Sequence, residues 1–215
     1  MPAATRRPGR PKGAQEDPEL RRERLLAAAE EAIRRHGVDV SMDQVAQVAG
    51  VSRPTLYDNF RNRAELAVAI IDRFGQPLLL DLLDGIGASS SLEGVVRTGL
   101  RIYLDHVEAN PEVYRFVIRN VADETLYLGV SGVFGLLVAA ALPSGGPSLE
   151  VAEGLGSAAL GAIVSATDRW SGGRRPPRPV FEAVLGDFVW GGLVAGGIVP
   201  DDRSIDLGPM LDPLR

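Results

Sequence analysis

Apolar residues recur every three to four positions along most of the chain, and this spacing places them on one face of an α-helix. The first such stripe consists of Leu25, Leu26, Ala29 and Ile33. Asp17 and Pro18 precede it with the residue types that start helices, and Gly37 follows it with the type that ends them. The pattern therefore predicts a helix that begins at Pro18 and ends near residue 36.

Further segments show the same period. We expect helices over about 62–75, 90–108, 148–171 and 180–198, two others that begin at Ser41 and Asn110, and one more that ends before Pro143. Ser41 with Gln44 has the spacing of a capping box, as has Asn62 with Glu65. Residues 172–179, GGRRPPRP, are expected to form a loop, because proline is not accommodated inside a helix. No run alternates with period two between hairpin turns, so the sequence predicts an all-α fold.

Residues 41–60, SMDQVAQVAGVSRPTLYDNF, contain two short helices separated by Gly50, where the chain must turn sharply. Ser52 can cap the second helix by accepting a hydrogen bond from a free amide, and Pro54 is tolerated in the first turn. A short second helix with a small and polar first turn is the part of a helix-turn-helix protein that enters the major groove of DNA. The segment therefore predicts DNA binding.

The second short helix has an inner and an outer side. Leu56 and Phe60 lie four positions apart and share the inner side, so Tyr57 and Asn59 point elsewhere. We expect base contacts from the first turn and phosphate contacts from the phenol, amide and guanidinium groups. The predicted DNA-binding residues here are Ser52, Arg53, Pro54, Thr55, Tyr57, Asn59, Arg61 and Arg63. A plain helical hairpin with a half-buried Tyr57 is the alternative, and the agreement of many positions favours DNA binding.

Charge is unevenly distributed along the chain. The first 74 residues carry 13 basic and 11 acidic side chains, and the remaining residues carry 10 and 17. Residues 1–16 are an arm rich in Pro, Gly and Arg, which we expect to be flexible away from DNA. The predicted DNA contacts of this arm are Arg6, Arg7, Arg10 and Lys12. They resemble a partial AT-hook for a narrow minor groove, and a solvated basic tail that only raises nonspecific affinity explains them equally well.

Composition argues against several other classes of protein. The chain of 215 residues has no cysteine, which excludes disulfides and thiolate metal sites. His36 and His106 lack the clustered partners that a metal needs, and Gly154-Leu-Gly156 lacks the spacing of a dinucleotide site. We therefore expect no enzyme, no cofactor and no metal. The Arg- and Pro-rich start is unlike a signal peptide, and the apolar runs are too short to cross a bilayer, so we expect a cytoplasmic protein.

Residues of about 18–74 resemble the DNA-binding domain of the TetR family of bacterial regulators. The resemblance rests on the segments RERLLAAAEEAI, SMDQVAQVAGVS and TLYDNF and on Gly37, Arg63, Glu65 and Leu66. It implies an all-helical homodimeric repressor, with a helix-turn-helix domain over 17–75 and an effector-binding and dimerisation domain over 76–215. The resemblance also implies DNA-backbone contacts from Ser41, Tyr57 and Arg63 and groove-facing positions for Arg53, Thr55 and Asn59. Pro54 departs from the small residue that is frequent at this position of the family.

In this family the last two long helices form the dimer, which here implies residues of about 148–171 and 180–198. Glycine inside a helix costs up to about 1 kcal/mol relative to alanine, so repeated glycine indicates that something packs very close. The final helix contains Gly186, Gly191, Gly192, Gly196 and Gly197, and the helix before it offers a small face of Ala158, Ala159, Ala162 and Ser165. A frayed helix end past Gly191 is the alternative to a dimer contact.

The resemblance also implies an effector pocket among the middle helices and the first dimer helix. Candidate pocket residues are Tyr103, Val107, Phe116, Asn120, Phe134, Ile163, Thr167 and Trp170. They are mostly apolar with a few polar groups, which suits a small hydrophobic or amphipathic effector. The segments PEVYRFVIRN and FVWGGL resemble those of family members that regulate lipid metabolism and sense acyl chains or acyl-CoA. For any single residue of the set, a place in the core is the simpler interpretation.

These observations predict a ligand-responsive repressor that a small hydrophobic effector releases from a palindromic DNA operator. The sequence leaves two other functions open. One is a nonspecific or architectural DNA-binding protein that uses the basic arm, and a footprint confined to a palindrome would exclude it. The other is an enzyme with a vestigial DNA-binding domain, which turnover of a bound acyl compound would reveal.

Overall fold

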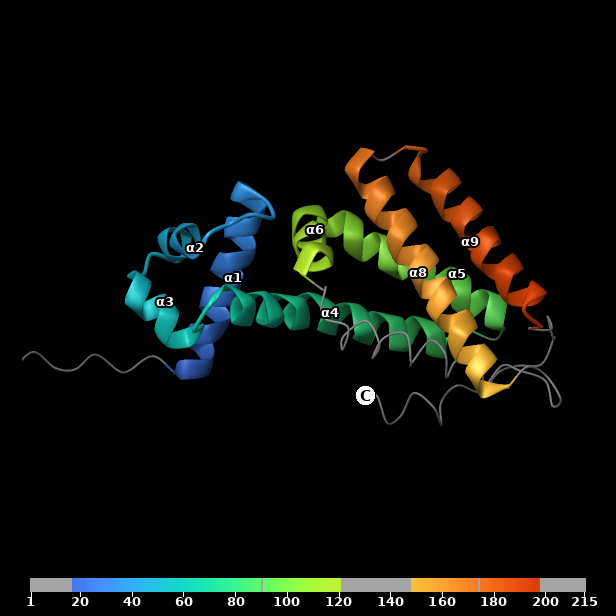
Figure 1. The fold of residues 1–215 in the computed structure, drawn as a ribbon, viewed down its shortest axis with the longest axis horizontal. Coiled ribbons are helices and arrows are strands. Elements are labelled where there is room, and N and C mark those ends of the chain that lie inside the picture. The colour runs from blue at the N-terminus through green and yellow to red at the C-terminus, as the bar shows by residue number, and fades with distance from the viewer. Residues whose placement is uncertain (1–16, 90, 121–147, 174, 198–215) are drawn as a thin grey trace, which may run out of the picture.

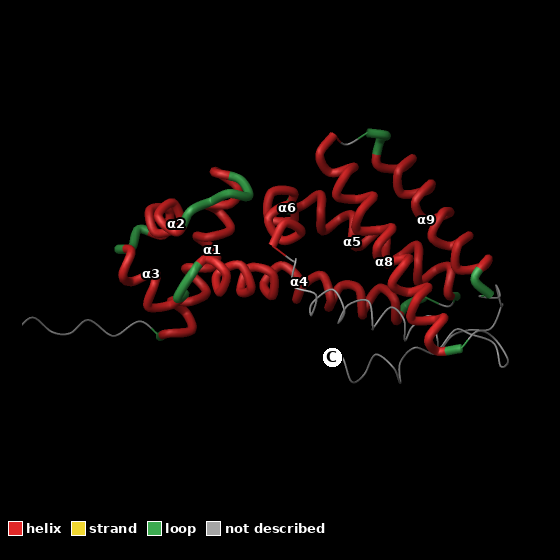
Figure 2. Tube along the Cα trace, viewed as in Figure 1, coloured by secondary structure: helices red, strands yellow, loops and turns green. Residues whose placement is uncertain are grey.

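The computed structural model describes residues 17–89, 91–120, 148–173 and 175–197. In these ranges the chain is helical and has no strand, which confirms the predicted all-α fold (Figures 1 and 2). The helices are α1 (Pro18–His36), α2 (Met42–Ala49), α3 (Arg53–Asn59), α4 (Arg63–Gly87), α5 (Leu92–Ala109), α6 (Pro111–Asn120), α8 (Leu149–Gly173) and α9 (Arg178–Ala195). Figure 1 shows α1, α2 and α3 gathered at one end, α5, α8 and α9 at the other, and the long α4 running between them. The predictions that lie outside the described residues are Arg6, Arg7, Arg10, Lys12, Phe134 and the helix before Pro143.

Local sequence signals define the starts of the first three helices. Asp17 Oδ1 accepts a hydrogen bond at 2.9 Å from the amide two residues on and so caps α1. Ser41 and Gln44 form the predicted capping box, because the amide of each residue donates to the side chain of the other, at 2.8 and 3.3 Å. Ser52 Oγ accepts a hydrogen bond from the amide of Thr55 at the start of α3. Each bond satisfies an amide that has no partner within its own helix, and all three predicted caps are confirmed.

The fourth helix extends further than its sequence predicts. The expected end at Gly75 is wrong, because α4 continues to Gly87 and contains Pro77. Beyond Gly75, the buried Leu83 packs in one cluster with apolar residues of α5. This tertiary packing outweighs the poor helix propensity of glycine and proline. As a result, α4 connects the helix-turn-helix segment continuously with the remaining helices.

Two glycine substitutions distinguish the turn at Gly50 from the helix interior at Gly75. Gly50 has a φ of +64°, and a Cβ there would meet no atom within 4 Å, so only the backbone conformation opposes alanine. We expect Gly50→Ala to lower the free energy of unfolding by about 1–2 kcal/mol. The surroundings of Gly75 are equally open, and Gly75→Ala is expected to raise this free energy by up to about 1 kcal/mol. Urea denaturation measures both changes, and a destabilised Gly75→Ala variant would contradict a continuous α4.

Two smaller helix boundaries also differ from the sequence prediction. Ser91, and not Ser90, caps α5, with its Oγ accepting a hydrogen bond at 3.1 Å from an amide of the first turn. The predicted loop over 172–179 is shorter in the structure, because α8 extends through Gly173 and Pro179 lies within α9. Proline fits there because the amides of a first helical turn have no partner within the helix.

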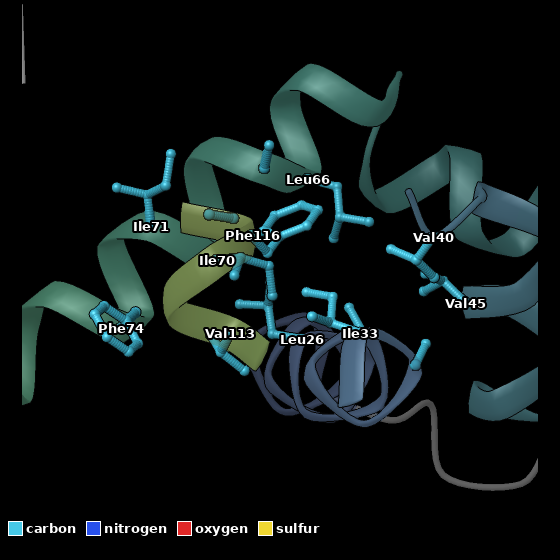
Figure 3. Packing of buried hydrophobic residues seen from close by; sticks show 14 of the residues in the cluster. Leu26, Ile33, Val40, Val45, Leu66, Ile70, Ile71, Phe74, Val113 and Phe116 are labelled. Atoms are coloured by element: carbon cyan, nitrogen blue, oxygen red, sulfur yellow. The ribbon is translucent and has the colours of Figure 1, made fainter. Parts of the chain in front are cut away.

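Two clusters of buried apolar side chains hold the helices together. The first joins α1, α2, α3 and α4 with α6, where Val113 and Phe116 pack with Leu26 and Ile70 (Figure 3). The second joins the distal half of α4 with α5, α8 and α9. Because α6 shares the core of the helix-turn-helix segment, a displacement of α6 changes the packing of that segment directly. The division of the chain into domains at residue 75 stays a prediction.

The long helix α8 is apolar along much of its length. Among the described residues it is the one helix that is long and apolar enough to cross a membrane by length and composition, and 28% of its most apolar window is buried. The core helices of globular domains meet the same criterion, and α8 packs on α5 and α9 through Ala159, Ile163 and Trp170. This finding therefore does not indicate a membrane protein.

Candidate nucleic-acid interface

Helix α3 has a buried side and an exposed side, as its sequence predicts. Leu56 and Phe60 are both fully buried against the other helices of the first cluster. Arg22 of α1 closes this contact, because its guanidinium carbon lies 4.5 Å from the centre of the Phe60 ring and its Nη1 donates at 3.0 Å to the carbonyl of Asn59. Tyr57 points away from this contact and keeps 42% of its surface exposed. The helix is thus held firmly with its outer side open to a ligand.

The first turn of α3 is ordered by side-chain hydrogen bonds. The hydroxyls of Ser52 and Thr55 lie 2.8 Å apart, and Ser52 also caps the helix. Both Arg53 and Pro54 are exposed at this end. At the other end, Asn59 Nδ2 donates at 2.8 Å to the carbonyl of Thr55, so the Asn59 amide stabilises the last turn of its own helix. The groove-facing role of Asn59 stays a prediction.

Arg63 joins three parts of the molecule. Its guanidinium donates to the carbonyls of Val38 and Val40 at 2.9 and 3.3 Å and to Asn120 Oδ1 at 3.2 Å. It also lies over the Phe116 ring of α6, at 5.4 Å from the ring centre. In the structure, Arg63 therefore ties the start of α4 to the loop before α2 and to the end of α6. The DNA-backbone contacts of Arg63, of the exposed Arg61 and of Ser41 stay predictions.

Two charged residues near α3 were not predicted from the sequence. Asp43 of α2 forms an ion pair with Arg53, the first residue of α3. Arg22 precedes Leu25 by three residues and so lies on the inner face of α1, which is a signal that could have identified its contact with α3. The Asp43 pair has no comparable signal, because it depends on the angle between two helices.

The candidate effector residues do not form one group. Val107 and Phe116 belong to the first cluster, whereas Ile163 and Trp170 belong to the second, and Tyr103 packs against both. Asn120 is held by Arg63 and by its own donation at 2.7 Å to the carbonyl of residue 116. An effector pocket that includes all of them stays a prediction.

Three hydroxyl groups of buried or partly buried residues come from α5, α6 and α8. Tyr103 donates to the hydroxyl of Tyr114 at 3.1 Å, and Tyr114 donates at 3.4 Å to the carbonyl of Val164. Burial raises the pKa of Tyr103 and raises the pKa of Tyr114 to about 12, so both phenols stay protonated near neutral pH. Thr167, one turn after Val164, is fully buried, and its hydroxyl has no hydrogen-bond partner in the part of the chain that the structure describes.

Trp170 has a structural role in the larger part of the molecule, which consists of the distal half of α4 with α5, α8 and α9. Its Nε1 donates at 2.8 Å to the carbonyl of Pro176, and its ring stacks on that of Phe181 with centres 4.8 Å apart. These contacts close the connection between α8 and α9. Across the described ranges, no group of three or more His, Asp or Glu residues could hold a metal ion.

Comparisons with known proteins agree with this architecture. Residues 25–70 match the model of a family described as bacterial regulatory proteins, tetR family. The chain is 39% identical over 101 residues to an uncharacterized HTH-type transcriptional regulator of Mycobacterium tuberculosis. The aligned segment covers 46% of this chain and 43% of that protein. It is 29% identical over 102 residues to the HTH-type transcriptional activator FasR of Mycolicibacterium smegmatis, which covers 47% of each. The chain thus spans about half the length of the curated relatives that it matches.

A solved structure extends the likeness to the fold of the larger part. A TetR-like transcriptional regulator from Rhodococcus sp. RHA1 superimposes with a TM-score of 0.64 at 21% identity, covering 84% of this chain and 99% of that one. The α2–α3 pair has the arrangement of a helix-turn-helix, and the matched relatives are named as HTH-type transcriptional regulators. Over residues 25–70 the chain thus resembles the tetR family of bacterial regulatory proteins, and its fold is similar to that of a TetR-like regulator.

Proposed function

We propose that this protein is a sequence-specific DNA-binding regulator of transcription in which α3 enters the major groove of an operator. The observation that carries the proposal is the division of α3 into two sides. Leu56 and Phe60 are fully buried, while the Ser52-capped first turn and Tyr57 face outward. A helix anchored in this way can present its first turn to base edges without losing contact with its own domain.

Footprinting of the full-length protein on genomic fragments tests this function. We expect protection of a discrete palindrome whose half-sites lie about one helical turn, or a multiple of it, apart. Affinity is expected to fall as salt rises, in proportion to the number of phosphates contacted. Uniform protection at all sequences would instead support an architectural DNA-binding protein, and no binding at low salt, with and without extracted metabolites, would contradict the proposal.

We propose further that two copies pair through α8 and α9. Val180, Val184 and Phe188 follow one another at four-residue spacing on α9 and are 50%, 62% and 68% exposed. Val151 of α8 adds 48% exposure on the neighbouring helix. Isolated exposed apolar residues are ordinary, but an aligned set of this size supports a protein interface. A second copy of the chain is the occupant that the family resemblance implies.

The glycines of α9 support the same surface. Gly186 and Gly196 face neighbours of their own chain, because a Cβ there would lie 3.2 Å from Arg97 and 2.7 Å from Leu155. At Gly191 and Gly192, by contrast, a Cβ would meet no described atom within 4 Å, and both glycines are exposed. Their small size is therefore not explained by packing within one chain, and a closely packed partner helix would explain it.

We propose that a small hydrophobic or amphipathic effector binds in the part of the molecule that follows the helix-turn-helix segment. It favours a dimer whose two α3 helices no longer match the spacing of the operator half-sites. The hydroxyls of the partly buried Tyr103 and of the buried Tyr114 and Thr167 offer neutral hydrogen-bonding groups beside apolar side chains. This chemistry suits an uncharged polar group attached to an apolar body. Release of DNA by the effector, and so repression, is the mode that we propose. Mass spectrometry of an organic extract of the purified protein, with a release assay using the compounds found, tests it.

The hydroxyl of Thr167 provides a specific prediction. Valine has nearly the same shape, so Thr167→Val is expected to raise the free energy of unfolding of the effector-free protein by about 1 kcal/mol, because it removes an unpaired buried polar group. The control on the same helix is Ser171→Ala, which removes a hydroxyl that donates at 2.8 Å to the carbonyl of Asp168. It is expected to lower that free energy by about 0.5–1.5 kcal/mol. Equal destabilisation by both substitutions in urea would contradict a free Thr167 hydroxyl.

A further inference from the structure

The ion pair between Asp43 and Arg53 links the two helices of the candidate DNA-binding site. Asp43 lies in the first turn of α2, and Arg53 is the first residue of α3. Their side chains are 53% and 64% exposed. An ion pair this exposed contributes little to the stability of a fold. Moreover, an acidic group beside the groove-facing helix repels DNA phosphates, so it weakens binding unless it serves another purpose there.

The geometry of the pair leaves one edge of the guanidinium available. The closest approach joins Asp43 Oδ1 to Nε, the inner nitrogen of Arg53. The guanidinium is planar and rigid, so a carboxylate at the Nε side leaves the end that carries Nη1 and Nη2 pointing away. These two nitrogens form the fork that donates to O6 and N7 of guanine in the major groove.

We propose that Asp43 is a specificity-determining residue that positions Arg53 to contact a guanine in each operator half-site. This inference rests on the proposed function, because it needs α3 to lie in the major groove. A free arginine on a helix start samples many rotamers and donates equally well to phosphates. Fixed at Nε by a carboxylate of the neighbouring helix, Arg53 instead presents both terminal nitrogens in one direction. Asp43 thereby lowers the affinity for DNA of any sequence and raises the preference for guanine at one position.

Asp43→Asn tests the inference, because asparagine keeps the size of the side chain and removes its charge. Its preference for guanine over the other bases at one half-site position is expected to fall about tenfold. Its affinity for DNA without an operator is expected to stay equal or to rise, since one negative charge near the phosphates is lost. Arg53→Lys retains the positive charge without the planar fork and is expected to lose the same base preference.

Asp39→Asn is the matched control. Asp39 is also an exposed acidic residue, lies in the loop before α2, and pairs with Arg119 of α6 at 4.0 Å. Its substitution removes the same charge near the same helices, so it is expected to change nonspecific affinity without altering base preference. The double variant Asp43→Asn, Arg53→Lys is expected to lose no more preference than either single variant, because both substitutions disrupt one contact.

The experiment selects preferred sites for the full-length protein from random duplexes. Single-base variants of the best site are then titrated at one salt concentration with each protein variant. A guanine whose preference falls in Asp43→Asn and Arg53→Lys but not in Asp39→Asn supports the inference. Unchanged preference in Asp43→Asn, or the absence of any guanine sensitive to Arg53→Lys, overturns it while the proposed function stands. If the unmodified protein selects no site at all, the proposed function fails first.

Discussion

Substitution of Phe188 by aspartate is expected to convert the protein to a monomer and to weaken operator binding about 100-fold or more. Phe188 is 68% exposed in one chain and lies near the middle of α9, between the two valines of its apolar stripe and the exposed Gly191 and Gly192. Central aromatic residues of interfaces each contribute about 2 kcal/mol or more, and an unpaired charge buried in their place adds a desolvation penalty. About 1.4 kcal/mol corresponds to a tenfold change in an equilibrium constant, so the dimerisation constant is expected to fall by at least two orders of magnitude. Operator binding is expected to fall with it, because both half-sites must be contacted by one dimer.

Light scattering after size-exclusion chromatography measures the oligomeric state of this Phe188→Asp variant, and titration of a labelled operator measures DNA binding. Val68→Asp is the control, because Val68 is 54% exposed on α4 and receives the same substitution away from the α8–α9 surface. The control is expected to remain a dimer. A dimeric Phe188→Asp protein would show that α9 does not form the interface, whatever its effect on DNA.

Helix starts were predictable because they depend on a few neighbouring residues. Asp17, Ser41 and Ser52 each accept a hydrogen bond from an amide two or three residues on, so the cap lies wholly within the local sequence. The end of α4 depends instead on packing against α5, the next helix of the chain, and such tertiary contacts cannot be read from the residues around Gly75 alone. Gly75 and Pro77 are poor helix formers, and packing of the residues beyond them on α5 keeps the helix continuous.

In the candidate site, too, the features that depend on spacing within one helix were predictable, and the contacts between helices were not. The inward direction of Leu56 and Phe60 follows from their four-residue spacing and from helical geometry alone. The partners of the charged residues do not follow from spacing. Arg63 and Asn120 are 57 positions apart, and only the docking of α6 on the helix-turn-helix segment brings them together. The sequence alone gives no reason to prefer an internal partner over a phosphate for such an arginine.

The effector residues show a different limit of sequence reasoning. An apolar side chain has the same pattern whether it lines a cavity or fills a core, and the structure divides the candidates between two cores. Val107 and Phe116 pack with the helix-turn-helix segment, whereas Ile163 lies in the larger part. A buried polar atom without a partner distinguishes a binding position from ordinary core, and among the candidates the Thr167 hydroxyl has no hydrogen-bond partner within the described ranges.

Tyr57 of α3 and Phe60, the residue that caps the end of α3, are expected to respond in opposite ways to truncation. Phe60 is fully buried under the Arg22 guanidinium, so Phe60→Ala is expected to lower the free energy of unfolding by about 3–5 kcal/mol. Tyr57 lies on the same helix and is 42% exposed, so Tyr57→Ala is expected to change this free energy by less than about 0.5 kcal/mol. Its operator affinity is nevertheless expected to fall about tenfold, because the hydroxyl that we propose to donate to a phosphate is lost from each protomer.

Urea denaturation and operator titration of both variants separate anchoring from recognition on a single helix. Loss of DNA binding by Phe60→Ala is explained by an unfolded helix-turn-helix segment, and it does not by itself locate the contact. Loss of binding by a stable Tyr57→Ala protein does locate it, on the outer side of α3. If Tyr57→Ala destabilises the protein as strongly as Phe60→Ala, Tyr57 is a core residue, and the outer side of α3 loses its support as a DNA-binding surface.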